Sequence, residues 1–291
     1  NDNACQDVTV AQDNGVVGQL DNNPDIPESC GVDIILVLDE SAAIQPPLLN
    51  SIRDGAKALW DALEGTGSSL AVVEFSDIGR LVEIGGDGTD TNAGQYIAVI
   101  EANREAFETY LDGLDATSPA GSAGYGPGAG SANWEDALLR TQQINETYGQ
   151  AAIVFFFSNG QPTSSNSPAE STPEEWIAAS IDEANTIKNT GSKIFGIGTT
   201  STAYDTLPNI TGVDKYDPTL PGSIATADYA ESSAGTLSSA MTATVFELCQ
   251  SSVTVNKKLW NSATDQYDIF ASDWRFDALI ETLDLGGSFA W

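Results

Sequence analysis

The sequence contains no histidine, only three cysteines, and 11 lysine or arginine residues against 42 aspartate or glutamate residues. Without histidine, Ser-His-Asp catalysis, histidine general bases and histidine-ligated zinc are all excluded. The formal net charge of −31 argues against nucleic acid as a partner, because phosphate binding needs a basic surface. The sequence has no run of 18 apolar residues, so it predicts no membrane span.

The acidic surface that this composition implies suits a salty or cation-rich medium, in which ions screen the repulsion between like charges. This interpretation predicts a halophilic or marine source. A plain solubility surface on an extracellular protein is the alternative. Two Asn-x-Thr sequons, at Asn145 and Asn209, are candidates for glycosylation in a secreted protein, although such short patterns also occur by chance.

The three cysteines are Cys5, Cys30 and Cys249, and no pair has the spacing of a metal site. Cys30 precedes the first predicted core strand and Cys249 follows the last predicted helix. A Cys30–Cys249 disulfide would therefore tie the two ends of one domain together and stabilise it by about 4–5 kcal/mol in the chain-entropy model. Buried thiols are the alternative. Cys5 would then pair between chains or stay reduced.

Composition divides the chain into three parts. Residues 1–29 form a polar N-terminal flank or linker, residues 30–250 a large domain, and residues 251–291 a β-rich tail or the start of a second module. Short strands are predicted in the flank (7–10 and 16–20) and in the tail (252–256 and 267–270). The tail is too short for a sandwich of about 100 residues. Its strands have three alternative partners: the flank, the main domain or another chain.

Within the large domain, buried-strand patterns alternate with helical stripes. This alternation predicts an α/β fold with a doubly wound, mostly parallel sheet flanked by helices. Strands are predicted at 32–38, 70–75, 80–84, 151–157, 193–197 and, most weakly, 213–216, with 80–84 antiparallel to its neighbour. Helices are predicted from Pro46, from about Ile97, from Asn133, from Pro173 and from about Leu237.

Polar residues follow two of the fully buried strands. Asp39, Glu40 and Ser41 follow the first, and Ser158 to Thr163 follow the strand at 151–157. Ligands bind at the carboxyl ends of strands in open α/β sheets. Asp39 and Glu40 are adjacent, so their side chains point to opposite sides and make a poor acid/base pair. The sequence also lacks a nucleophile elbow, a phosphate loop and a dinucleotide fingerprint, and it predicts no catalytic residue.

Three stretches together carry a resemblance to a known family. They are the strand that ends in Asp39–Ala43, the helix start Asn133–Leu138, and the segment Phe156–Thr163. From about Cys30 to Cys249 the chain resembles a von Willebrand factor A domain of the surface adhesin and pilus type. The resemblance implies a metal-ion-dependent adhesion site, in which serine, threonine and aspartate oxygens from three loops bind Mg²⁺ or Ca²⁺.

This chain departs from the family pattern at that site. Asp39 and Ser41 match it, but Ala43 replaces the second serine, Ala132 stands at the threonine position, and Asn159 replaces the aspartate of the third loop. Hard divalent ions prefer charged oxygen ligands. The resemblance therefore implies a degenerate site at Asp39, Ser41 and Asn159, with weak or absent binding of Mg²⁺ or Ca²⁺ and no required cofactor.

The resulting functional expectation is a non-catalytic protein that acts outside the cell or on its surface. It would serve as an adhesin or as a pilus or filament subunit, with protein partners and with homo-oligomer formation through the β flanks. The alternative is a Mg²⁺- or Ca²⁺-dependent ligand receptor with an active adhesion site.

Overall fold

The computed structural model describes residues 8–11, 17–25, 31–41, 44, 46–85, 92–113, 130–220, 223–232, 239, 241–242, 258–261 and 266–270, and the account below is limited to these. Contacts divide the chain into two units, residues 1–250 and 251–291. In the second unit, β10 (Lys258–Asn261) and β11 (Gln266–Phe270) pair as an antiparallel hairpin. In the described part of the chain, no helix is long and apolar enough to cross a membrane.

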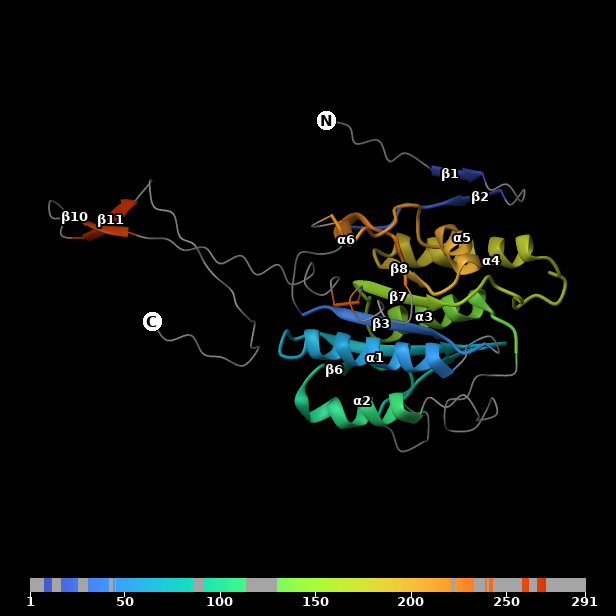
Figure 1. The fold of residues 1–291 in the computed structure, drawn as a ribbon, viewed down its shortest axis with the longest axis horizontal. Coiled ribbons are helices and arrows are strands. Elements are labelled where there is room, and N and C mark those ends of the chain that lie inside the picture. The colour runs from blue at the N-terminus through green and yellow to red at the C-terminus, as the bar shows by residue number, and fades with distance from the viewer. Residues whose placement is uncertain are drawn as a thin grey trace. The chain divides into compact units, whose positions relative to one another are not determined.

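The first unit is built on a seven-stranded sheet with the strand order β5-β4-β3-β7-β8-β9, and β6 also pairs with β4 (Figure 1). The pairs β3–β4, β3–β7, β7–β8 and β8–β9 are parallel, whereas β5 and β6 run antiparallel to β4. The strands are β3 (Asp33–Asp39), β4 (Ser69–Phe75), β5 (Gly79–Leu81), β6 (Ile97–Ala98), β7 (Ile153–Ser158), β8 (Lys193–Gly198) and β9 (Tyr229–Glu231).

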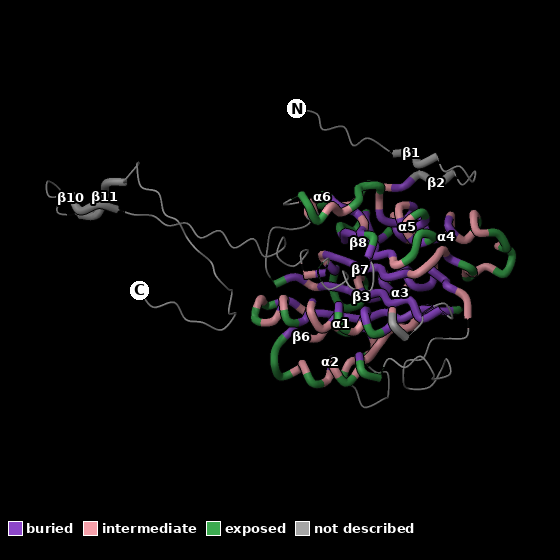
Figure 2. Tube along the Cα trace, viewed as in Figure 1, coloured by how far each residue is buried: buried purple, intermediate pink, exposed green. Residues whose placement is uncertain are grey.

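Helices cover both faces of this sheet, which confirms the predicted α/β class. Two hydrophobic clusters lie between the layers: one joins α1 and α2 to the sheet, and the other joins α3, α4, α5 and η1 to its opposite face. The strands between the helices are almost entirely buried (Figure 2). The helices are α1 (Pro46–Leu63), α2 (Glu101–Gly113), α3 (Trp134–Tyr148), α4 (Pro173–Asn189), α5 (Ser201–Thr206), η1 (Leu207–Asn209) and α6 (Ser223–Thr226).

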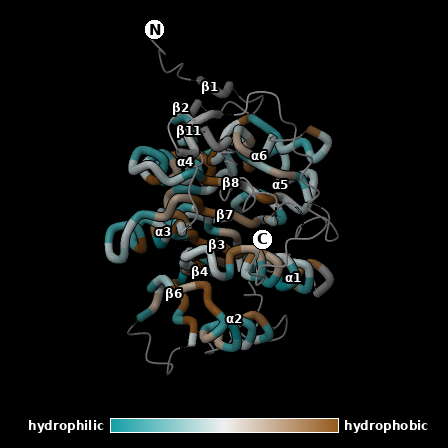
Figure 3. Tube along the Cα trace, turned by 90° about the vertical axis from the view of Figure 1, so that its left-hand side faces the viewer, coloured by the Kyte–Doolittle hydropathy of each residue, from teal (hydrophilic) through white to brown (hydrophobic). Residues whose placement is uncertain are grey.

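The central strands are hydrophobic on both faces because both faces are covered. Ile35 and Val37 of β3 belong to one cluster, and Ile34, Leu36 and Leu38 belong to the other. The same strands carry hydrophobic colour in Figure 3, whereas the outer turns of α3 and α4 are mainly hydrophilic. Such continuous apolar runs are typical of buried parallel strands, and they explain why the sequence located β3, β4, β7 and β8 correctly.

The order of the strands brings the two polar strand ends together. β3 and β7 are direct neighbours, and Leu38 is paired with Phe157 in the parallel register. Both strands run in the same direction, so Asp39 and Ser158 emerge at the same edge of the sheet. The convergence on which the functional expectation depends is therefore confirmed.

The structure corrects three predicted elements. Ile97 is not helical: it lies in β6, where it pairs with Leu70, and α2 begins only at Glu101. Residues 213–216 do not form a strand. Lys215 makes a single bridge to Tyr229, and the edge strand is β9, whose three residues are too few to give a recognisable pattern. Of the predicted last helix, Ser239 and Met241–Thr242 are helical, and the remainder lies outside the described residues.

The N-terminal flank packs on the large domain in its described part. β1 (Val8–Ala11) and β2 (Val17–Leu20) pair as an antiparallel hairpin, close to the two predicted strands. Leu20 is buried against Ile177 and Ile181 of α4. Asp21 then contacts Asn185 and Lys188 of α4, and Asn23 contacts Ile194 of β8. Leu20 of the flank is therefore packed against the large domain.

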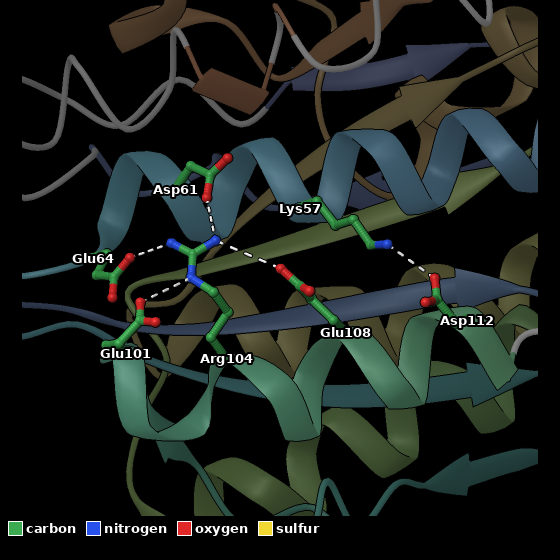
Figure 4. A network of polar contacts seen from close by, with 7 residues as sticks. All are labelled: Lys57, Asp61, Glu64, Glu101, Arg104, Glu108 and Asp112. Carbon is green, nitrogen blue, oxygen red and sulfur yellow. Dashed lines mark hydrogen bonds and ion pairs between the residues drawn. The ribbon is translucent and has the colours of Figure 1, made fainter.

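Helices α1 and α2 are joined by a network of charged side chains (Figure 4). The Arg104 guanidinium on α2 makes ion pairs with Asp61 and Glu64 of α1 and with Glu101 and Glu108 of its own helix. Next to it, Lys57 pairs with Asp112 at 2.9 Å between Nζ and Oδ1. This network brings one guanidinium against four carboxylates at the partly exposed junction of the two helices.

Candidate functional site

Asp39, at the end of β3, is the centre of the candidate site, and only 1% of its surface is exposed. Its Oδ1 accepts a hydrogen bond from the backbone N–H of Ser41 at 2.8 Å. Its Oδ2 accepts one from the Ser158 hydroxyl at 2.8 Å and a longer one, at 3.4 Å, from the backbone N–H of Asn159. Both carboxylate oxygens are thus engaged by the chain itself.

Burial raises the pKa of Asp39, because a charged carboxylate loses its hydration there. The hydrogen bonds from Ser41, Ser158 and Asn159 oppose this rise by stabilising the charged form. The hydroxyl of Ser41 contributes as well as its backbone N–H. The three groups therefore take over the role that water or a cation would have around an exposed carboxylate.

The second loop of the site, residues 130–133, is also held by contacts within the protein. Ala132, at the expected threonine position, is buried, and its N–H donates to Thr163 Oγ1 at 2.8 Å. The N–H of Thr163 returns a bond of 2.9 Å to the carbonyl of Ala132. Ser131 donates its N–H to Asp77 Oδ1 at 2.6 Å. The methyl group of Ala132, held by backbone hydrogen bonds to Thr163, thus occupies the position where the family pattern would place a metal-binding hydroxyl.

The turn beside this loop is fixed by α3. The N–H of Gly79 donates to Asp136 Oδ2 at 2.7 Å, and its carbonyl accepts from Arg140 Nε at 3.2 Å. A Cβ atom at position 79 would lie 2.6 Å from the carbonyl oxygen of Asp136, so only glycine fits. Asn133 caps α3 by accepting from the N–H of Asp136 at 3.1 Å. Asp136 and Arg140 of α3 thereby provide hydrogen-bond partners for the N–H and the carbonyl of Gly79, the first residue of β5.

Glu40 belongs to a separate cluster on the opposite face of the sheet, as its position next to Asp39 predicted. Its Oε2 lies 4.0 Å from an Arg80 guanidinium nitrogen, and its side chain shares a hydrogen bond with Glu74. Glu74 also accepts a hydrogen bond of 2.7 Å from the Tyr110 hydroxyl. Burial raises the pKa of Glu74 to about 7, against the lowering effects of Tyr110 and Arg80.

The structure brings together all three predicted metal-site residues, Asp39, Ser41 and Asn159. Ser158 also contacts Asp39, although the sequence predicted it only as one of the polar residues after the strand at 151–157 and not as a site residue. Ala43 lies outside the described residues. Asp39 supplies the only carboxylate among the three groups. Across the described ranges, no three His, Cys, Asp or Glu side chains form a group that could hold a metal ion.

The two predicted glycosylation asparagines have inward contacts. Asn145 Nδ2 donates to Ser192 Oγ at 3.1 Å, and Asn209 is 3% exposed, with its Nδ2 donating to the carbonyl of Thr206 at 2.7 Å. A glycan on either nitrogen would displace these contacts. Glycosylation stays a prediction, as does the Cys30–Cys249 disulfide, because all three cysteines lie outside the described residues.

Comparison with solved structures finds proteins of similar fold. No protein-family model and no curated protein match the sequence. The von Willebrand factor domain of the type V pilus tip protein Mfa5 from Porphyromonas gingivalis is similar to the chain, with a TM-score of 0.50 at 12% identity, over 78% of this chain and 99% of that one. The pilus adhesin SpaC from Lactobacillus rhamnosus GG matches with a TM-score of 0.50 at 15% identity, over 79% of this chain.

Proximal thread matrix protein 1 from the mussel byssus is also similar, with a TM-score of 0.47, 17% identity and coverage of 77% of this chain. The chain spans 47% of that protein's chain and 32% of the SpaC chain. At these identities the likeness concerns architecture. The mostly parallel sheet, its flanking helices and the match to Mfa5 together show that the chain has a von Willebrand factor A-like fold.

Proposed function

We propose that this chain is a non-catalytic interaction protein that works outside the cell or on its surface, as an adhesin or as a pilus or filament subunit. The fold supports the proposal, since similar architectures occur in a protein described as a pilus adhesin and in one described as a pilus tip protein. The strongly acidic composition also suits a protein that stays soluble outside the cell.

The observation that carries the proposal is that Asp39, at the carboxyl edge of the sheet, is already hydrogen-bonded by Ser41, Ser158 and Asn159. A divalent cation at Asp39 would have to displace the Ser158 hydroxyl or the N–H of Ser41, each of which lies 2.8 Å from a carboxylate oxygen. Loss of the bond from Ser41 would leave a buried N–H without its acceptor, which costs about 1–3 kcal/mol, whereas the Ser158 hydroxyl can turn to the carbonyl of Gly160 at 3.2 Å. Asn159 offers an uncharged amide in return. Recognition of a partner through this edge therefore proceeds through protein contacts rather than through a shared metal ion.

A catalytic role has little physical support in the described residues. Asp39 and Glu40 contact different groups on opposite faces of the sheet, so the two adjacent carboxylates do not converge on one substrate position. The chain has no histidine to act as a general base near neutral pH. These features favour a binding module over an enzyme.

Self-association through the β flanks is part of the same proposal. The hairpins β1–β2 and β10–β11 are each two-stranded sheets within their own units. Isolated two-stranded hairpins are marginally stable in water, and their outer strands can accept another strand. Strand addition between copies would extend both hairpins and link subunits into a filament.

The experiment that tests the proposal combines electron microscopy with chemical crosslinking of the native material. We expect ordered assemblies, or attachment to the producing cell surface, and we expect both to survive an excess of EDTA. Monomers that neither associate nor attach to a surface would contradict the proposal. Assemblies that dissolve in EDTA and re-form with Mg²⁺ or Ca²⁺ would favour the second candidate.

That second candidate is a receptor whose ligand binding depends on Mg²⁺ or Ca²⁺. One observation favours it: Asp39, Ser41 and Asn159 do converge at the carboxyl edge of the sheet, as an adhesion site requires. In this reading, a cation replaces the internal hydrogen bonds when a partner supplies a further carboxylate.

A further inference from the structure

Asn159 is followed directly by Gly160, and the pair lies just after the end of β7. Asparagine side chains are among the chemically labile groups of proteins. An asparagine before a glycine is the most prone to lose its amide, because the main-chain nitrogen of the next residue reaches the carboxamide carbon most easily when that residue has no Cβ. The pair is therefore a candidate modification site within the candidate functional site.

The backbone does not require a glycine at position 160. The φ angle of Gly160 lies outside the left-handed region that favours glycine. A Cβ atom built there would meet no atom of the described residues within 4 Å, apart from those of its chain neighbours. In contrast, a Cβ at Gly79 would lie 2.6 Å from a carbonyl oxygen. What glycine contributes at position 160 is an open approach to the side chain of Asn159.

The attacking group, the main-chain nitrogen of Gly160, is loosely held. Its N–H donates to Ser158 Oγ at 3.3 Å, a long hydrogen bond, and it lies beyond the last residue of β7. Among the described residues, none is hydrogen-bonded to the carboxamide of Asn159. Both residues of the pair are partly exposed. The carboxamide can therefore turn toward this nitrogen, and water can reach the product.

The main chain of Asn159 is held more firmly than its side chain, by the ends of two other strands (Figure 1). Its N–H donates to Asp39 Oδ2 at 3.4 Å, and its carbonyl accepts from the hydroxyl of Thr200, which follows β8. An ordinary aspartate at position 159 keeps these main-chain contacts. An isoaspartate inserts a methylene group into the main chain and displaces them, so the fold favours aspartate as the product.

We propose that Asn159 is a site of spontaneous deamidation, through which the folded chain gains a second carboxylate beside Asp39. The nitrogen of Gly160 attacks Cγ of Asn159, the N–Cγ bond forms, the Cγ–Nδ2 bond breaks, and the proton of the N–H leaves with Nδ2 as ammonia. Water then adds to one carbonyl of the resulting succinimide. The bond from that carbonyl to the nitrogen breaks, and the nitrogen regains a proton. One water is consumed and one ammonia is released, with no oxidation or reduction.

The product changes the charge at the carboxyl edge of the sheet. The main-chain nitrogen of residue 159 is 3.4 Å from Asp39 Oδ2, so a carboxylate on the same residue lies within one Debye length, about 8–10 Å, of Asp39. Carboxylates are the ligands that Mg²⁺ and Ca²⁺ prefer. We expect the deamidated chain to bind these ions more tightly than the chain as synthesised. This consequence rests on the second candidate function, whereas the deamidation does not.

The test is a time course of the folded full chain at mildly alkaline pH, followed by mass spectrometry of the tryptic peptide 141–188. This peptide contains Asn159 but not the other Asn-Gly pair, Asn14–Gly15. A synthetic peptide of residues 156–163 gives the rate without the fold. We expect the fold to slow the loss of the amide by no more than about tenfold, because one hydrogen bond of about 1 kcal/mol has to break. The share of aspartate over isoaspartate should be higher in the folded chain than in the peptide. A folded chain that keeps the amide while the peptide loses it would overturn the proposal.

Two variants test the chemical route. Gly160→Ala should slow the loss by about tenfold or more, because the added Cβ hinders the approach of the nitrogen. Gly113→Ala is the matched control: Gly113 of α2 also has an ordinary φ and open space around it, and the rate should not change. Equal rates in Gly160→Ala and the natural chain would exclude attack by this nitrogen.

Calorimetry with Mg²⁺ and Ca²⁺ separates the modification from its consequence. The freshly folded chain, the aged chain and Asn159→Asp are compared, and the last two should bind the ions more tightly than the first. A chain that has lost the amide but binds no more tightly would leave the modification standing and contradict its link to the second candidate function.

Discussion

The two ends of the sheet hold their buried polar groups in opposite ways. At the carboxyl end, Asp39 accepts hydrogen bonds of 2.8 Å from the N–H of Ser41, two residues further along the chain, and from the hydroxyl of Ser158, at the end of the neighbouring strand. At the amino end, Lys193 Nζ and Asp228 Oδ1 are separated by 3.8 Å, and the same oxygen accepts a hydrogen bond from Asn23 of the distant flank. The contacts of Asp39 come from the strand ends themselves, whereas one contact of Asp228 requires the N-terminal flank to dock on the domain.

The difference reverses the usual expectation for this architecture. Ligands of open α/β sheets bind at the carboxyl ends of the strands. Here both carboxylate oxygens of Asp39 at that end already accept hydrogen bonds from the chain itself. At the amino end, the Lys193 amine and the Asn23 carboxamide both lie near one oxygen of Asp228. The following predictions test this contrast, from the largest expected effect to the smallest.

Replacing Asp39 should have the largest effect on stability. Asp39→Ala leaves the backbone N–H groups of Ser41 and Asn159 without their acceptor, whereas the Ser158 hydroxyl can still donate to the carbonyl of Gly160 at 3.2 Å. We expect the free energy of unfolding to fall by about 3 kcal/mol, since each unsatisfied buried group costs about 1–3 kcal/mol. Urea unfolding followed by tryptophan fluorescence measures this. A loss smaller than about 0.5 kcal/mol would show that the carboxyl end is not held together by Asp39.

Shortening Leu20 should weaken the docking of the flank on α4. Leu20→Ala removes a buried side chain from its contact with Ile177 and Ile181. We expect a cost of about 2 kcal/mol, at the lower end of the range for buried Leu→Ala changes, because this cluster is small. Hydrogen exchange of residues 17–25 should speed up, while exchange in β3 should stay unchanged. Equal acceleration in both segments would mean that the flank and the core unfold as one unit.

The pH dependence of stability should isolate Glu74. Its pKa is about 7 in the folded chain and near 4.5 when unfolded, so the folded state holds a proton that the unfolded state loses between these values. The free energy of unfolding therefore falls as the pH rises from about 4.5 to 7, by an amount on the order of 3 kcal/mol over the whole interval.

The variant Glu74→Gln should lack this decline, because its amide imitates the protonated carboxyl. Unfolding of both proteins at pH 5 and pH 8 gives the difference, from which other titrating groups cancel. The groups that face Glu74 are Tyr110 of α2, Arg80 of β5 and Glu40 after β3. Parallel pH profiles for the two proteins would show that Glu74 is ionised in the folded state.

The network around Arg104 should contribute least, although it contains the most ion pairs. Arg104→Met removes one cation and leaves four carboxylates close together, but the side chains are partly exposed and screened. We expect a loss below about 1 kcal/mol, which shrinks in 1 M salt. Lys57→Met, which affects the single pair with Asp112, is the control. A larger loss that salt does not change would indicate that packing of the arginine side chain dominates.

The sequence predicted the elements whose pattern is strong and failed where tertiary contacts decide. Continuous apolar runs located β3, β4, β7 and β8, and the stripe from Pro46 located α1. The two residues of β6 and the three of β9 are too few to show any periodicity, and the spacing of Ile97 from later apolar residues predicts a helix where the chain forms a strand. The docking of Asn23 on Ile194 could not be predicted either, since a single asparagine carries no signal about a contact 171 positions away.

The candidate site shows the same division. Asp39, Ser41 and Asn159 could be placed at one edge because parallel neighbouring strands end together. The partners of Asp39 could not, because the choice between a hydroxyl, a backbone N–H and a cation depends on distances of a few tenths of an ångström. The Ser158 hydroxyl donates to Asp39 at 2.8 Å, and nothing in the sequence distinguishes it from any other serine at the end of a strand.

Titration calorimetry with Mg²⁺ and Ca²⁺ tests the central claim, that Asp39 is already satisfied by its own chain, most directly. We expect no saturable heat from the natural chain at millimolar ion. The variant that combines Ala43→Ser, Ala132→Thr and Asn159→Asp, which restores the hydroxyls and the second carboxylate, should gain binding. A one-to-one, saturable heat from the natural chain that disappears in Asp39→Ala would contradict the account.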